Sequence, residues 1–155
     1  MRAKDIMIPV QDFLTPENTL KEAVILLKTA RRGEAGVGVK GLPVLDADSR
    51  IIGMLSMRDI LKAVFPFYMT MMDLGDFTWD GMLEDIARRS SQRKVREIMS
   101  KEVITVPADA PLMECIDRML KHNIKRLPVI TEEGRLTGMI YERDVFFVIT
   151  KAMLN

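Results

Sequence analysis

The sequence predicts an α+β fold in which two β-α-β-β-α repeats pack as a pseudo-two-fold pair. A seven-residue motif occurs in two similar copies, GMLSMRD at 53–59 and GMIYERD at 138–144, which share Gly, Met, Arg and Asp at the same places. At the same offset of 85 residues, LPVLD at 42–46 aligns with LPVIT at 127–131. Self-similarity at a fixed offset indicates one structural unit used twice, in which each copy buries its apolar face against the other.

A second offset defines the boundaries of the repeats. AKDIM at 3–7 aligns with VREIM at 95–99 at an offset of 92, which exceeds the later offset of 85 by seven residues. The first copy therefore carries a loop insertion at about 31–41. The predicted organisation is a first repeat at 1–65, a helical inter-repeat segment at 66–94 and a second repeat at 95–155.

Each repeat is expected to begin with a short extended segment and to continue into a helix. Apolar residues recur at helical spacing in TLKEAVILLKTA at 19–30 and in PLMECIDRMLKHN at 111–123. Thr19 suits an N-cap, and Pro111 suits the first turn of a helix. These signals predict one helix in each segment.

Two apolar strands around a polar turn are expected next, followed by a last helix. The strand pairs are LPVLDADSRIIGML at 42–55 and RLPVITEEGRLTGMI at 126–140, and the last helices begin near Ser56 and Tyr141. The Glu-Gly pair in the second turn is typical of a hairpin. Because a unit of about 60 residues buries a limited share of its surface, the two sheets are expected to pack face to face and share one core.

Composition excludes several classes of function. The chain of 155 residues is 48% apolar and 29% charged, with a net charge of +1, so no global charge attracts nucleic acid or an anionic membrane. It has no signal-peptide core and no apolar run of about 20 residues, which predicts a cytoplasmic protein without a membrane span. Cys115 and His122 are the only Cys and His. Seven residues apart on one helix, they would be separated by roughly 10 Å, so we expect neither a catalytic pair nor a metal cluster, and Cys115 should lie in the core.

The inter-repeat segment at 66–94 permits two interpretations. It contains Trp79 with Met69, Met71 and Met72, and Met-rich surfaces can serve as binding faces. The favoured interpretation is a helix near 80–90 that closes over the core. A basic cluster at 88–96 follows a run of acidic residues, which indicates a charge-balanced, solvated segment more than a nucleic-acid surface.

The two repeats resemble a pair of cystathionine-β-synthase (CBS) domains. The resemblance is carried by the tandem β-α-β-β-α unit, the hydrophobic-Pro-Val step at 42–44 and 127–129, and the closing G-h-h-S/T-x-x-D phrase. It implies a regulatory module that is not an enzyme and needs no cofactor. It further implies clefts between the repeats that bind AMP, ADP, ATP or S-adenosylmethionine. A homodimer, or a separate effector protein, would carry the output.

The resemblance also implies which residues bind the ligand. The Asp of the closing phrase would hold the ribose hydroxyls beside a Ser or Thr, and a basic residue before the Pro-Val step would face the phosphate. Carried over by position, the candidates are Ser56, Asp59, Lys125, Arg126, Tyr141 and Asp144. Tyr141 departs from the small hydroxyl residue of the pattern, which predicts a narrowed, reshaped or closed cleft. Gly41 stands where the second copy has Arg126.

Structural alternatives remain open for these residues. Ser56 and Asp59 also have the spacing of a capping box, whereas Tyr141 cannot cap in the same way. GVGVKG at 36–41 matches a dinucleotide fingerprint, but it leads into a strand, so a loop is predicted. If both clefts are degenerate, the chain would serve as a dimerisation or protein-interaction module that binds no nucleotide.

Overall fold

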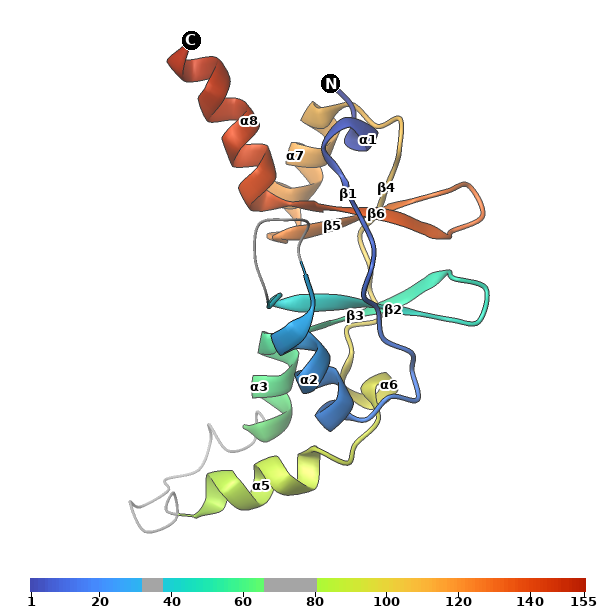
Figure 1. Cartoon of the computed structure of the whole chain (residues 1–155), viewed down its shortest axis with the longest axis vertical. Coiled ribbons are helices and arrows are strands. Elements are labelled where there is room, and N and C mark those ends of the chain that lie inside the picture. The colour runs from blue at the N-terminus through green and yellow to red at the C-terminus, as the bar shows by residue number, and fades with distance from the viewer. Residues whose placement is uncertain (32–37, 66–80) are drawn as a thin grey trace.

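The fold consists of two sheets lying face to face with helices on their outer sides (Figure 1). The structure is a computed structural model of the chain and describes residues 1–31, 38–65 and 81–155. The first repeat contains α2 (Leu20–Thr29), β2 (Gly41–Leu45), β3 (Ile51–Ser56) and α3 (Met57–Val64). The second contains α7 (Leu112–Lys121), β5 (Arg126–Ile130), β6 (Leu136–Tyr141) and α8 (Glu142–Leu154). The predicted helices and strand pairs are confirmed.

Local sequence signals explain where the helices begin and where the hairpins turn. The Thr19 hydroxyl accepts a hydrogen bond from the Glu22 amide at 3.2 Å and caps α2, while Pro111 occupies the corresponding position before α7. Both hairpin turns contain a residue with positive φ, Ser49 at 64° and Gly134 at 84°, and these positions are 85 residues apart. The predicted turn in the second copy is therefore matched by a turn of the same kind in the first.

The tips of the two hairpins join the repeats. The Ile51 amide donates to the Gly134 carbonyl at 3.3 Å, and the Leu136 amide donates to the Ser49 carbonyl at 3.0 Å. These two bonds are related by the offset of 85 residues, so they follow the pseudo-two-fold symmetry. The sheets are thus tied by main-chain hydrogen bonds at this end.

Each repeat sends its leading arm to the other repeat. In the first arm, β1 (Ile8–Pro9) follows α1 (Ala3–Ile6) and pairs antiparallel with β6 of the second repeat. In the second arm, Ser100 follows α6 (Val95–Ile98) and bridges to Met54 in β3 of the first repeat. With β4 (Val106–Pro107) parallel to β5, the larger sheet has the order β1-β6-β5-β4, and β2 and β3 form the smaller one. The two four-residue helices were not predicted, because they are too short to show periodicity.

The expectation of one shared core is wrong. Buried apolar side chains form two clusters, one in each repeat, and each arm contributes a residue to the cluster of the other repeat: Ala3 to the second and Val95 to the first. Cys115 is fully buried in the second cluster, as predicted. The exchange of arms, rather than a single common core, therefore links the repeats.

The exchanged arms explain why the closing phrases begin with glycine. A Cβ atom built on Gly53 would lie 2.5 Å from Met99 Sδ, and one built on Gly138 would lie 2.7 Å from Met7 Sδ. Met7 and Met99 are equivalent positions of the two arms. Each methionine packs on the glycine of the opposite repeat, where a side chain would collide with it.

The helix expected near 80–90 is present as α5 (Met82–Ser90), which contacts α3. Met69, Met71, Met72 and Trp79 of the same segment lie outside the described residues. Within the described ranges, no helix has the length and apolar character needed to cross a membrane.

Candidate functional site

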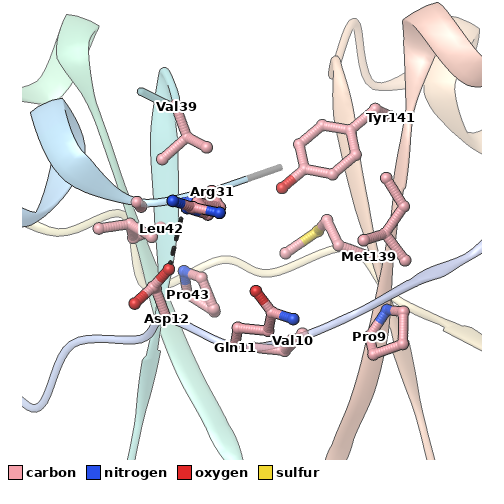
Figure 2. A pocket seen from close by; sticks show the side chains of 12 residues that line it. Pro9, Val10, Gln11, Asp12, Arg31, Val39, Leu42, Pro43, Met139 and Tyr141 are labelled. Carbon is pink, nitrogen blue, oxygen red and sulfur yellow. Dashed lines mark hydrogen bonds between the residues drawn. The ribbon is translucent and has the colours of Figure 1, made fainter. Parts of the chain in front are cut away.

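A narrow cleft separates the two sheets on the side where the first arm crosses between them (Figure 2). Leu42 and Pro43 of β2 face Met139 and Tyr141 of β6, and the arm from Ile8 to Asp12 passes below them. The remaining lining residues are Ala30, Arg31 and Val39. The cavity volume is ≈ 20 Å³, about the room needed by one water molecule.

The ring of Tyr141 occupies part of this cleft. Figure 2 shows it reaching from β6 across the opening toward the side of Val39 and Arg31. A serine or threonine at this position would leave that space open. The resemblance led us to expect a narrowed, reshaped or closed cleft because of this tyrosine, and the cavity beside its ring is small.

A second, wider cavity adjoins the narrow cleft, and we call it the basic cavity. It is lined by Val39, Lys40, Lys125, Arg126, Tyr141, Glu142 and Arg143, and its volume is ≈ 370 Å³. Val39 and Tyr141 line both spaces, so they stand between them. Of the seven lining residues that the structure describes, four are cationic and one is anionic, which makes the basic cavity suited to anions.

Arg126 reaches from the second repeat to the first. A Cβ atom built on Gly41 would lie 2.7 Å from Arg126 Nε and 2.9 Å from Cζ, so the guanidinium lies directly against the Gly41 backbone. Burial lowers the pKa of Arg126 from its usual value, while Tyr141 and Asp59 act in the opposite direction. Gly41 and Arg126 occupy equivalent positions, and the absence of a side chain at Gly41 leaves room for the one arginine.

The closing phrase of the first repeat forms a complete capping box. Asp59 Oδ2 accepts from the Ser56 amide at 2.8 Å and from Ser56 Oγ at 3.0 Å, and the Asp59 amide donates to Ser56 Oγ at 3.2 Å. Asp59 Oδ1 accepts from Ser100 Oγ at 3.1 Å. Both carboxylate oxygens are thus engaged by the protein, one of them by the arm of the second repeat.

The closing phrase of the second repeat has a different environment. Tyr141 makes no side-chain cap to α8, and Ile8 stands at the position equivalent to Ser100. Both hydroxyl partners of Asp59 therefore lack counterparts around Asp144. Among the described residues, only two buried side-chain polar atoms have no hydrogen-bond partner, and they are Asp144 Oδ2 and Arg126 Nε.

The structure brings only some of the candidate residues together. Lys125, Arg126 and Tyr141 line the basic cavity, whereas Ser56, Asp59 and Asp144 line neither space. Asp144 lies in the first turn of α8, three residues beyond Tyr141. Arg143, which could serve as a phosphate ligand or a solvated residue, lines the basic cavity and has its guanidinium 5.3 Å from the centre of the Phe147 ring.

Sequence analysis missed Ser100 and the arm residues from Ile8 to Asp12. Ser100 directly follows the repeated segment at 95–99, so the repeat itself was the available signal, but its contact with Asp59 spans 41 residues. For Cys115, burial raises the thiol pKa, which agrees with a core role. No group of three or more His, Cys, Asp or Glu side chains able to hold a metal occurs in the described ranges.

Comparison with known proteins defines the class. The sequence matches the CBS domain at residues 3–66 and 95–151, which together cover most of the chain, and the protein belongs to the CBS domain family. The structure superposes on the CBS-pair protein CBSX2 from Arabidopsis thaliana with a TM-score of 0.73 at 23% identity, covering 99% of this chain and 97% of that one. A crystal structure of CBSX2 in complex with AMP gives a TM-score of 0.70 at 22% identity, covering 98% of each chain.

The sequence relatives include one that is matched over most of its length and others that are much longer than this chain. An uncharacterized protein of Methanocaldococcus jannaschii is 30% identical over 120 residues, which covers 69% of this chain and 71% of the relative. Inosine-5'-monophosphate dehydrogenase of the same organism is 26% identical over 144 residues, covering 93% of this chain. The chain spans only 23% of the length of that dehydrogenase.

Proposed function

We propose that this CBS pair is a regulatory module, not an enzyme, that binds an adenosine-containing nucleotide between its repeats. The observation that carries the proposal is the buried, unpartnered Oδ2 atom of Asp144. In the proposed complex, Asp144 accepts hydrogen bonds from the ribose hydroxyls, and Arg126 and Lys125 face the phosphate. Tyr141 borders the nucleoside.

The two buried atoms without a partner belong to groups of opposite charge, the Asp144 carboxylate and the Arg126 guanidinium. A buried carboxylate oxygen without a donor costs about 1–3 kcal/mol or more, so its presence needs a compensating partner. A ribose diol offers two donors to one carboxylate. Arg126 Nε, the other unpartnered atom, is a donor that suits the phosphate of the same ligand. One nucleotide would thus satisfy both atoms.

Ligand entry requires the narrow cleft to widen, and this requirement supplies a regulatory mechanism. A cavity of ≈ 20 Å³ is far smaller than the roughly 300 Å³ of a small-molecule site. Movement of the Tyr141 and Met139 side chains, or separation of the two sheets, would open it. A ligand that binds only the open arrangement shifts the population toward it. We propose that a homodimer or a separate effector protein responds to that shift.

The AMP complex of CBSX2 supports the proposal by analogy, since the two folds superpose over nearly their whole lengths. The closed cleft favours the alternative function, a CBS pair that acts as a dimerisation or protein-interaction module without a nucleotide. The two functions differ in whether the protein binds a nucleotide through Asp144.

The test is calorimetric titration of AMP, ADP, ATP and S-adenosylmethionine into wild type, Asp144→Ala and Asp117→Ala. Asp117 is a matched control, because it is an exposed carboxylate on α7 paired with Lys121. We expect at least one ligand to bind wild type and the control equally, and Asp144→Ala to weaken that binding at least tenfold. At 100 times its dissociation constant, the ligand should stabilise the fold by about 2.7 kcal/mol. Equal binding to all three proteins, or no binding to any, would refute the proposed site.

A further inference from the structure

We infer that the basic cavity is a polyphosphate site, which makes the protein select nucleoside di- and triphosphates over monophosphates. Lys40 of the first repeat and Lys125 and Arg143 of the second would hold the terminal phosphates. This inference rests on the proposed function, because the nucleoside is taken to occupy the adjoining narrow cleft.

The position and size of the basic cavity support this assignment. The narrow cleft and the basic cavity meet at Val39 and Tyr141, so a chain of phosphates can pass from one to the other. A volume of ≈ 370 Å³ lies within the range of small-molecule sites and exceeds what a single phosphate group needs. The space therefore suits a ligand that extends beyond its first phosphate.

Its charge also exceeds what a monophosphate can neutralise. Among the residues that the structure describes, four cations and one carboxylate, Glu142, line the basic cavity, and their charges sum to +3. A phosphate monoester carries about −1.5 to −2 at neutral pH, and each further phosphate adds negative charge. None of the six side-chain ion pairs found in the described ranges uses Lys40, Lys125, Arg126 or Arg143. Within the described ranges, these cations therefore have no carboxylate at ion-pair distance, although Asp59 acts on Arg126 from farther away.

The backbone around the basic cavity adds positive potential. The first turn of α8 lines it, and Tyr141 provides no side-chain cap to that helix. The positive end of a helix dipole, with amide groups not paired inside the helix, favours anions. Here the helix terminus reinforces the side-chain cations and does not act alone.

The two lysines hold equivalent places on opposite repeats. The Lys40 carbonyl accepts from the Met57 amide at 2.9 Å, and the Lys125 carbonyl accepts from the Glu142 amide at 3.0 Å. Their backbones are therefore anchored to the starts of α3 and α8, while both side chains are exposed. A polyphosphate held by both lysines would connect the repeats at the end of β2 and β5 opposite the joined hairpin tips.

The experiment compares dissociation constants for AMP, ADP and ATP by calorimetry in magnesium-free buffer of constant ionic strength. The proteins are wild type, Lys40→Gln, Lys125→Gln and the control Lys21→Gln, which removes an exposed lysine of α2. We expect ATP to bind wild type and the control at least tenfold more tightly than AMP. Each cavity variant should lose about tenfold in ATP affinity, the effect of one charge-assisted contact. Lys40→Gln should stay within twofold of wild type for AMP, whereas Lys125→Gln should also weaken AMP, because Lys125 is proposed to face the first phosphate.

Two outcomes separate this inference from the proposed function. If AMP and ATP bind wild type equally, or if Lys40→Gln weakens both equally, the polyphosphate site is wrong while the nucleotide site stands. If no adenine nucleotide binds, inorganic tripolyphosphate is titrated instead. Binding to wild type that is lost in Lys40→Gln would support the polyphosphate site alone, and absence of binding would overturn it.

Discussion

The aspartates that end the two closing phrases, Asp59 and Asp144, differ in their hydrogen-bond partners. In the first repeat, Asp59 receives three hydrogen bonds, from Ser56 and from Ser100. In the second, Asp144 keeps one buried oxygen without a partner, and Tyr141 and Ile8 stand where the two serines would be. The comparison teaches that a repeated motif conveys position rather than role. The first aspartate fastens one repeat to the arm of the other, and we propose that the second binds a ligand.

A similar asymmetry lies at the start of the paired strands. Arg126 projects from β5 onto Gly41, its equivalent in β2. On a pseudo-two-fold pair, equivalent side chains at this place compete for the same space. One large cation on one repeat is accommodated because the other repeat has none.

We expect the largest loss of stability from Gly41→Arg, which gives both repeats an arginine at this position. The new side chain would compete with Arg126 for part-buried space and bring two cations together. Overpacking of this kind costs about 1–3 kcal/mol before charge repulsion, so we expect the free energy of unfolding to fall by about 3 kcal/mol or more. Urea denaturation measures the loss.

The double variant Gly41→Arg with Arg126→Gly provides the control. It moves the single arginine to the other repeat and should recover most of the stability lost in Gly41→Arg. A double variant no more stable than the single one would show that the two positions do not share space.

We expect substitutions of Asp59 and Asp144 to change the free energy of unfolding differently. Asp59→Ala removes the acceptor of three hydrogen bonds, one of which links the repeats, and we expect it to cost about 2 kcal/mol. Asp144→Ala removes a carboxylate oxygen that is buried without a partner, so the free energy of unfolding should stay constant or rise. Urea denaturation of the unliganded proteins checks both values. Equal losses in the two variants would contradict the distinction.

Ser100→Ala isolates the contribution of the hydrogen bond between Ser100 and Asp59. It deletes only the bond between the repeats and should cost about 1 kcal/mol. In Asp59→Ala the same change should have little further effect, because the partner is already gone. Additive losses would show that Ser100 stabilises the fold by another route.

The sequence predicted what depends on neighbours along the chain and missed what depends on contacts across it. Helical spacing located α2 and α7, and two apolar runs around a polar turn located each hairpin, because those signals act within a few residues. The exchange of arms was not predictable in this way, since the contacts of Met7 with Gly138 and Met99 with Gly53 join distant segments. The state of Asp59 likewise depended on Ser100, 41 residues away.

The cores of the two repeats differ at one position of their first long helices. Cys115 and Ala23 occupy equivalent positions on α7 and α2, and both are fully buried. Burial raises the thiol pKa of Cys115 in the folded protein. Above the unfolded-state pKa of about 8.5, the unfolded chain therefore releases the thiol proton while the native protein retains it. Because the unfolded state then binds fewer protons than the native state, stability must fall as pH rises through this range.

Cys115→Ala should remove that dependence by giving the second repeat the residue of the first. We expect wild type to lose up to about 1 kcal/mol more than the variant between pH 8 and pH 9.5. The measurement is urea denaturation at a series of pH values, with the difference between the two proteins cancelling the titration of lysines and tyrosines. Below pH 8 that difference should be constant, because the thiol is mostly protonated in both states. Parallel curves up to pH 9.5 would mean that the thiolate forms as readily in the folded core as in the unfolded chain, which would contradict the burial of this side chain.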